Sequence, residues 1–364
     1  AYFTVIANPS LKWETQISTD IALEFGLFDR LTGTIEYFKK DSKDLLFDVS
    51  QPASVGVTSI IQNIGKVTNS GVEIELDYNA FKNKDWSVSV GANATFVKNK
   101  IKNLPATMKE NGYISGSKKW LEGKSIYEFW LRQWHGVDPQ TGDGLYVADV
   151  SKYNQGNIGT GDGNITQSQF DEYKKTVVTI DGKELTNSYT YAKYDFSGSS
   201  IPDVYGGFNV RVSYKNFELA AVFSYQLGGQ ILDTNYATMM SMTEFGYAQS
   251  PDLLKAWKQA GDITEVPRID NSAAHTTNIG QSYSTRWLTS SDYLNLRSVT
   301  IGYQLPKTWL SKVMLKSARL NLTAENLFML KARQGLNPMA NYSGVTYNEY
   351  MPSRNITLGL NVSF

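Results

Sequence analysis

The sequence predicts an all-β fold in which about nine long antiparallel strands form a portion of a transmembrane β-barrel. Three observations lead to this prediction. Apolar and polar side chains alternate along nine segments, which is the period of a β-strand. The segments run for about 10 to 16 residues, enough to cross a bilayer with tilt. The connections between them alternate between short turns and long loops.

The final segment alternates strictly, with Ile356, Leu358 and Leu360 on one side, small polar residues on the other, and the aromatic Phe364 at its end. The other segments repeat this pattern with less regularity. The expected strands are 15–25, 31–46, 67–79, 86–101, 205–214, 217–228, 293–305, 318–329 and 354–364. A loop of about 20 residues is expected after residue 46, and another after residue 329.

The two longest connections, 102–203 and 230–290, interrupt the strand pattern. We place the stretch 123–137 within the first of them and predict a short helix at 251–259 in the second. With short and long connections alternating, all short turns lie at one end of the sheet and all long loops at the other. Outer-membrane barrels have this arrangement, with short periplasmic turns and long external loops.

Aromatic residues cluster where the expected strands begin and end, as they do at membrane interfaces. At the short-turn end they are Phe25, Phe28, Tyr78, Trp86, Tyr214, Phe217, Tyr303, Trp309 and Phe364. At the long-loop end they are Trp13, Tyr37, Phe96, Tyr225 and Phe328. The alternative fold is a soluble β-sandwich, in which the same aromatics would fill the space between two sheets. The corresponding alternative function is a soluble or surface-attached β-rich glycan-binding module.

Composition narrows the function. The 364 residues carry a formal net charge of zero, which gives no electrostatic footprint for nucleic acid. The chain has no cysteine, so disulfides, thiolate metal sites and cysteine nucleophiles are excluded. No apolar run is long enough for a transmembrane helix. The chain opens at Ala1 without a signal peptide, and we expect a mature or cut piece of a longer protein.

Nine spanning strands cannot close a bacterial barrel, because such barrels have even strand numbers. An open edge would also expose unpaired backbone groups to lipid. We therefore expect further strands from outside this chain.

Several motifs, in order along nearly the whole chain, resemble the carboxy-terminal barrel portion of SusC/RagA-type TonB-linked outer-membrane transporters of Bacteroidetes-like bacteria. They are Asn8-Pro9-Ser-Leu-Lys-Trp13-Glu14, Asn69-Ser-Gly71-Val-Glu73, Gly136-Val-Asp138-Pro139-Gln-Thr-Gly142, Pro202-Asp-Val-Tyr-Gly206-Gly207, Tyr293-Leu-Asn-Leu-Arg297-Ser-Val-Thr-Ile-Gly302-Tyr303, Glu325-Asn326-Leu327-Phe328 and the terminal Phe364. The resemblance covers residues 1–364 as one unit.

This resemblance implies a 22-stranded barrel in the bacterial outer membrane, whose remaining strands and plug lie outside this chain. It further implies a SusD-like surface lipoprotein as a lid, and energy from the TonB complex through parts not present here. The implied function is active import of a nutrient, glycan oligosaccharides first or else peptides. Outer-membrane lipid is an implied partner, and nucleic acid is not.

The polar sides of the strands are predicted to face the lumen, and five residues mark them: Glu73, Glu75, Asp77, Arg211 and Arg319. The acids alternate along one strand, so they lie on one face about 7 Å apart. A surface glycoside hydrolase that uses Glu73 and Glu75 is the enzymatic alternative. We favour a wet lumen lining and expect no catalytic residue.

Aromatic residues in the first long connection are candidates for contact with substrate or lid, because aromatic faces stack on sugar rings. They are Trp120, Tyr127, Trp130 and Trp134, and the alternative is ordinary loop packing. The two histidines, His135 and His275, lie in separate loops without metal-ligand spacing. We expect no metal and no cofactor. Calcium is the one candidate cofactor, at the Asp/Gly turns 138–144 and 157–166, although neither has the acids of a calcium loop.

Overall fold

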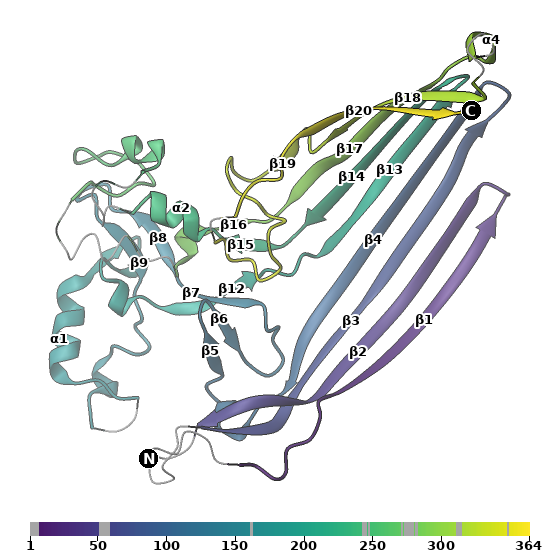
Figure 1. Cartoon of the computed structure of the whole chain (residues 1–364). Helices are drawn as coiled ribbons and strands as arrows, with labels where there is room; N and C mark the ends of the chain where they lie inside the picture. Colours follow the sequence, from purple (N-terminus) through teal and green to yellow (C-terminus); the bar gives the residue numbers. More distant parts are fainter. Residues whose placement is uncertain are drawn as a thin grey trace.

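The computed structural model describes residues 7–50, 59–160, 163–241, 246, 248–270, 272, 280, 283–310, 315–347 and 349–364. Figure 1 shows a wide, curved antiparallel sheet with a body of loops, short strands and helices at one end. Strands succeed one another across this sheet in the order β1-β2-β3-β4-β13-β14-β17-β18-β20, and β19 pairs with β17 beside β18. The nine strands on the main path are the nine that the sequence predicts.

The strands of the wide sheet are β1 (Thr15–Leu27), β2 (Leu31–Ser50), β3 (Ser59–Lys82), β4 (Trp86–Asn103), β13 (Val204–Tyr214), β14 (Phe217–Leu227), β17 (Tyr293–Gln304), β18 (Ser317–Glu325), β19 (Met329–Lys331) and β20 (Asn355–Ser363). Each pairs antiparallel with its neighbours. The first and last strands on the path, β1 and β20, leave the sheet open within the described part of the chain. The described strands therefore form an open sheet that does not close into a barrel by itself.

The cross-strand register gives the sheet two distinct faces. Leu23 lies opposite Ile35, and Ile35 lies opposite Ile74, so aliphatic side chains continue across the strands on one side. We call this side the apolar face and the opposite side the polar face. The apolar face is not covered, since Leu23 is 63% exposed and Leu358 is 70% exposed. A β-sandwich would bury these side chains, so the sandwich alternative is not favoured.

An aromatic row crosses the apolar face at the short-turn end. Trp86 on β4 lies opposite Tyr214 on β13 with ring centroids 4.3 Å apart. Tyr214 lies opposite Phe217 on β14, which in turn lies opposite Tyr303 on β17 at 4.4 Å between centroids. Four successive strands thus carry an aromatic at the same height, as expected of an interfacial belt.

Two strands are longer than the sequence predicts. The predicted loop of about 20 residues after residue 46 is wrong, because β2 and β3 stay paired up to Ser50 opposite Ser59. Residues 51–58 lie outside the described residues.

Other predicted elements are shorter than expected. The predicted eighth strand ends early, at Glu325, and β19 follows as a separate segment. The predicted helix at 251–259 is a shorter 3-10 helix, Pro251–Lys255.

The body at the long-loop end contains three small sheets. Strands β12 (Tyr194–Ser199), β7 (Glu128–Arg132), β6 (Lys118–Trp120) and β5 (Tyr113–Ser115) form one of them. Strands β10 (Val177–Ile180), β11 (Lys183–Thr186), β9 (Gly144–Val147) and β8 (Trp134–Val137) form the second, and β15 (Gln230–Leu232) pairs with β16 (Leu288–Ser290) in the third. The stretch 123–137 lies in this body, as predicted.

The helices are short. They are α1 (Gln167–Thr176), α2 (Thr234–Met239), α4 (Lys307–Leu310) and the 3-10 helices Ala106–Met108, Gln155–Asn157, Tyr189–Tyr191, Pro251–Lys255 and Thr285–Trp287. Helix α1 begins at a capping box, in which the Thr166 hydroxyl accepts from the backbone N–H of Gln169 and the Gln169 side chain accepts from Thr166. In the described part of the chain, every helix is too short or too polar to cross a membrane.

The largest buried cluster lies in the loop body. Phe129 and Leu131 from β7 join Leu232 from β15, Trp287 from the second long connection and Val345 from the connection before β20. Three connections that are far apart in sequence therefore share one hydrophobic core. This shared core fixes the loops as a single assembly, which we call the loop assembly, over the long-loop end of the sheet (Figure 1).

Candidate functional site

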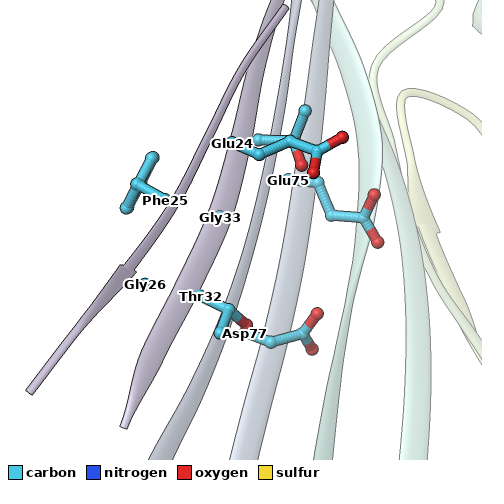
Figure 2. Close-up of a pocket in the computed structure, with 8 residues that line it drawn as sticks. Glu24, Phe25, Gly26, Thr32, Gly33, Glu75 and Asp77 are labelled. Atoms are coloured by element: carbon cyan, nitrogen blue, oxygen red, sulfur yellow. The ribbon is translucent and has the colours of Figure 1, made fainter. Parts of the chain in front are cut away.

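The polar face of the sheet carries the predicted acidic residues. Glu73, Glu75 and Asp77 alternate along β3, where they lie opposite Glu36, Thr34 and Thr32 of β2. In Figure 2, Glu24, Glu75 and Asp77 extend to one side of the sheet, whereas Phe25 points to the other. Glu24, Glu75 and Asp77 line a hollow of about 560 Å³ together with threonine and glycine residues of β2. The hollow is polar and open, as a water-filled surface would be.

The predicted basic residues lie farther across the same face. Arg211 on β13 is 3.5 Å from the Glu218 carboxylate, and Arg319 on β18 donates to the other oxygen of Glu218 at 2.8 Å. The structure thus places all five predicted residues on one face. It brings the two arginines together at Glu218 and leaves the β3 acids in a separate group. That this face lines a lumen stays a prediction.

The four predicted aromatic residues are all half-buried, but they do not form one cluster. Trp120 packs against Phe47, 5.9 Å between centroids, and its indole N–H donates to the carbonyl of Ile126 at 3.2 Å. Trp134 lies edge-on to Tyr146 at 5.1 Å, and the guanidinium of Arg286 lies 4.7 Å from its ring centroid. Both rings have neighbours that belong to the protein itself.

Tyr127 and Trp130 lie closer to the junction between loops and sheet. Tyr127 is edge-on to Tyr342 at 5.1 Å between centroids, which joins the first long connection to the connection before β20. Trp130 is in register with Phe196 of β12, 4.9 Å away, and is nearly parallel to the ring of Tyr194 at 6.1 Å. Trp130 is therefore the centre of an aromatic group on one face of the β12-β7-β6-β5 sheet.

Cations border this aromatic group. The amine of Lys119 lies 4.1 Å above the Trp130 ring. The guanidinium of Arg132 lies between Tyr194 and Tyr189, at 4.6 and 4.8 Å from their centroids, and it donates to the Tyr189 carbonyl at 2.9 Å. In cation–π contacts of this kind, the positive charge is attracted to the face of the aromatic ring. Sequence reasoning missed Arg132, Tyr194 and Phe196, although alternation within 128–132 gave a local strand signal.

The opposite face of the same small sheet is buried. Lys118 has only 9% of its surface exposed, and its amine donates to the Tyr127 carbonyl at 2.8 Å while lying 3.2 Å from the Phe129 ring centroid. Burial lowers the pKa of Lys118 to about 7. Burial likewise raises the pKa of Tyr146 to about 12 and lowers that of Arg286 to about 10. Lys118, Tyr146 and Arg286 lie in the interior of the loop assembly, and burial is the first cause of each of these pKa shifts.

Among the residues that the structure describes, the candidate metal ligands are not brought together. His135 is exposed, and His275 lies outside the described residues. In the turn 138–144 the Asp138 carboxylate accepts from the Gln140 N–H and the Thr141 hydroxyl, both at 2.9 Å, which is an ordinary turn cap. In the second turn, residues 161–162 lie outside the described residues. Within the described ranges, no group of three His, Cys, Asp or Glu side chains is placed to hold a metal ion.

Comparison with known proteins adds to this geometry. The family model described as TonB dependent receptor-like, beta-barrel matches residues 1–168. The chain is 29% identical over 380 residues to TonB-dependent receptor P3 of Formosa agariphila, covering 99% of this chain and 35% of that protein. It is 24% identical to TonB-dependent receptor SusC of Bacteroides thetaiotaomicron, covering 98% of this chain and 32% of that protein.

A solved structure shares the fold. The structure of the RagAB peptide transporter matches with a TM-score of 0.77 and 25% identity, covering 99% of this chain and 36% of the matched chain. The chain thus spans about a third of the length of the relatives that it matches.

Proposed function

This chain belongs to the barrel of the SusC/RagA-type TonB-dependent receptors of the bacterial outer membrane, and from that premise we propose that it forms part of a wall through which a nutrient is actively imported. The single observation that carries the proposal is the division of the wide sheet into an exposed apolar face and a polar face. Such a sheet suits lipid on one side and a water-filled passage on the other.

The passage is proposed to be closed by parts outside this chain. Two open sheet edges, at β1 and β20, require further strands, because unpaired backbone groups are not tolerated in lipid. None of the ion pairs between described residues involves Glu73 or Glu75. The carboxylates of these two residues could therefore interact with a plug or with water. We infer that a plug fills the barrel and that the TonB complex acts on it.

A SusD-like surface lipoprotein is the proposed partner over the loop assembly. The support is twofold: the relatives include SusC, and the matched structure is named as the RagAB peptide transporter. The loop assembly has a shared hydrophobic core, which would make it a rigid base for such a lid. A rigid docking surface loses less conformational entropy when a partner protein binds to it.

The proposed cargo is glycan oligosaccharides, or else peptides. Half-buried rings around Trp130 offer apolar contact, and Lys119 and Arg132 beside them offer donors. Sugars and peptides both combine flat apolar patches with many hydrogen-bonding groups. We infer no covalent chemistry, so the acids of β3 would act as lumen lining and not as a hydrolase pair.

Uptake by living cells tests this proposal. Cells that carry or lack the full-length receptor would be given labelled oligosaccharides and labelled peptides, with and without a protonophore. We expect uptake of one of the two classes to depend on the receptor and to stop when the proton gradient collapses. Receptor-independent uptake of both classes, or uptake that is insensitive to the protonophore, would contradict active import.

A further inference from the structure

The apolar face changes character at the long-loop end of β2, β3 and β4. Up to the row formed by Tyr37, Val72 and Phe96, its side chains are apolar or aromatic. In the next row the register aligns Lys39 with Ser70 and Ser70 with Lys98. The three strands extend past the row that contains Tyr37 and Phe96. These lysines therefore lie just beyond the level at which aromatic residues mark a membrane interface.

The basic side chains continue over the following rows. Thr68 lies opposite Lys100, and Lys43 lies directly opposite Lys66. Asp41 is the one acid among these rows of β2, β3 and β4, and it is 3.4 Å from Lys39 and 4.0 Å from Lys66. We call Lys39, Lys43, Lys66, Lys98 and Lys100 the lysine face. Its positive charge exceeds what Asp41 neutralises.

A groove opens at the edge of the lysine face. Pairing of β4 with β13 stops at Thr95 opposite Tyr205, and the chain before β13 then leaves the sheet. Farther along, β4 is paired again, because Ile101 and Lys124 are joined by a backbone hydrogen bond of 2.8 Å. The groove between these points has a volume of about 580 Å³.

The lining of the groove is amphipathic. Tyr37 and Phe96 form its apolar side, and Lys98, Lys100 and Lys124 form its basic side. Glu128 and Asp203 also line it, toward the loop assembly. The apolar side continues the surface that faces acyl chains, and the basic side lies beyond it. A ligand that fits both sides has an apolar body and an anionic head.

The other half of the sheet lacks this feature. On β14, β17 and β19 the apolar face stays aliphatic or aromatic up to the loops, with Leu227, Leu294 and Leu330 around a second groove, and Lys331 is the one basic residue in the lining of that groove. The basic rows are therefore local to β2, β3 and β4, and they are not a general property of the long-loop end. A local site is expected for a specific headgroup.

We propose that the lysine face and its groove bind the phosphorylated headgroup of an outer-leaflet lipid, namely the lipid A part of lipopolysaccharide. Ammonium groups bind phosphate as compact charges, and long lysine stems reach the headgroup level while covering apolar surface. The acyl chains would lie along Tyr37 and Phe96, and the phosphate would lie among Lys39, Lys98 and Lys100. This inference uses the outer-membrane location and does not depend on import, so the two proposals can fail separately.

The test compares two charge-matched variants of the full-length receptor. The first is the triple variant Lys39→Gln, Lys98→Gln and Lys100→Gln. The control is Lys82→Gln, Lys84→Gln and Lys307→Gln, three exposed lysines at the short-turn end. Binding of labelled lipopolysaccharide to each purified receptor in neutral detergent would be titrated, and inorganic phosphate would be added as a competitor. Heat-modifiable gel mobility would show that each variant is folded.

Each lysine near an anionic lipid surface contributes roughly a fivefold gain in affinity. We therefore expect the first variant to bind lipopolysaccharide at least tenfold more weakly and the control to bind within about twofold of the wild type. Equal weakening of both variants, or no weakening of the first, would overturn the proposal. Displacement by millimolar inorganic phosphate alone would also overturn it, because it would indicate a site for free phosphate. Should the triple variant fail to fold, Lys98→Gln alone is compared with Lys82→Gln.

Discussion

The guanidinium of Arg319 on β18 donates to the carboxylate of Glu218 on β14 at 2.8 Å, across the strand β17 that separates them. The contact is possible because Gly302 occupies the position on β17 between the two side chains. A Cβ atom there would lie 2.6 Å from the nearer guanidinium nitrogen. A glycine in the middle of a strand thus keeps a path open for an ion pair on the polar face.

Gly302→Ala is expected to displace the Arg319 side chain and weaken this ion pair. Because both partners are partly exposed, we expect a loss of no more than about 1 kcal/mol in the free energy of unfolding. The measurement is the midpoint of heat-modifiable mobility in detergent gels. The matched control is Gly359→Ala on β20, whose added Cβ would meet no heavy atom closer than 4.0 Å.

A double-mutant cycle separates the ion pair from other effects of the added methyl group. If the methyl acts through Arg319, its cost should shrink when Glu218 is already changed to Gln. An undiminished cost in the Glu218→Gln background would show that the alanine acts on the backbone of β17 instead.

Asp233 anchors the loop assembly, and its loss should loosen the loops without opening the sheet. Its carboxylate caps α2 by accepting from the Tyr236 N–H at 3.0 Å, accepts from the Thr346 hydroxyl at 3.2 Å and pairs with Arg333. Asp233 is 3% exposed and the Arg333 side chain is 27% exposed, so Asp233→Ala leaves a partly desolvated arginine without its counter-charge. Removing one partner of a fully buried pair costs about 3 to 5 kcal/mol, and because Arg333 is partly exposed we expect the lower end of that range.

Hydrogen exchange checks this expectation. Protection should fall in α2 and in the segment around Thr346, whereas β3 and β4 should keep theirs. Glu110→Ala, at an exposed position of the first long connection, is the control and should change neither region. Unchanged exchange at α2 in Asp233→Ala would mean that the hydrophobic core alone holds the connections together.

The strands were predictable where the sheet has one apolar face and one polar face. In that zone, residues such as Leu76 and Asp77 must alternate, and the sequence records the alternation directly. The ends of β2 and β3 were not predictable, because the apolar alternation stops there and Lys39, Ser70 and Lys98 follow on the same face. Asp44, with φ of +56°, also shifts the register there, so the remaining pattern changes phase.

The loop assembly illustrates the opposite limit. Helix α1 has a local signal in its capping box, Thr166 with Gln169, which sequence reading can recognise. The neighbours of Trp130 have none, since Tyr194 and Arg132 meet only after 61 intervening residues have folded between their strands. Contacts of this kind arise from tertiary packing. The sequence could therefore indicate the four aromatic candidates, but it could not predict which residues surround them.

Lys118 should make the loop assembly more stable as pH rises from about 7 toward 10. Burial lowers the pKa of its folded state to about 7, below the ordinary value of 10.5 that applies when the chain is unfolded. Between these two values the unfolded state binds the extra proton and the folded state does not, so stability rises with pH. Below about pH 7 both states are protonated, and the dependence from this group ends.

Lys118→Met should abolish this rise and also stabilise the loop assembly at neutral pH, because the side chain no longer loses hydration of a charge on folding. Lys119→Met, on the neighbouring residue, should keep the rise. Resistance of the first long connection to limited proteolysis between pH 6 and 9 provides the measurement. A pH dependence that is the same in Lys118→Met and in the wild type would assign it to other groups.

Trp130→Ala should impair import much more than it impairs folding, if the aromatic group around Trp130 contacts the cargo. Removing the ring takes away contacts with Tyr194 and Phe196 and leaves the amine of Lys119 without its partner. We expect the concentration for half-maximal uptake to rise by about tenfold, which corresponds to about 1.4 kcal/mol of binding free energy. Trp130→Phe, which keeps an aromatic face, should restore most of the affinity. Trp309→Ala, a substitution of an exposed tryptophan at the short-turn end, should leave uptake affinity unchanged.

Hydrogen exchange of β7 and β12 decides between the two interpretations of Trp130. A rise in the half-maximal concentration with intact protection of both strands supports cargo contact. Lost protection in both strands instead assigns the residue to loop packing.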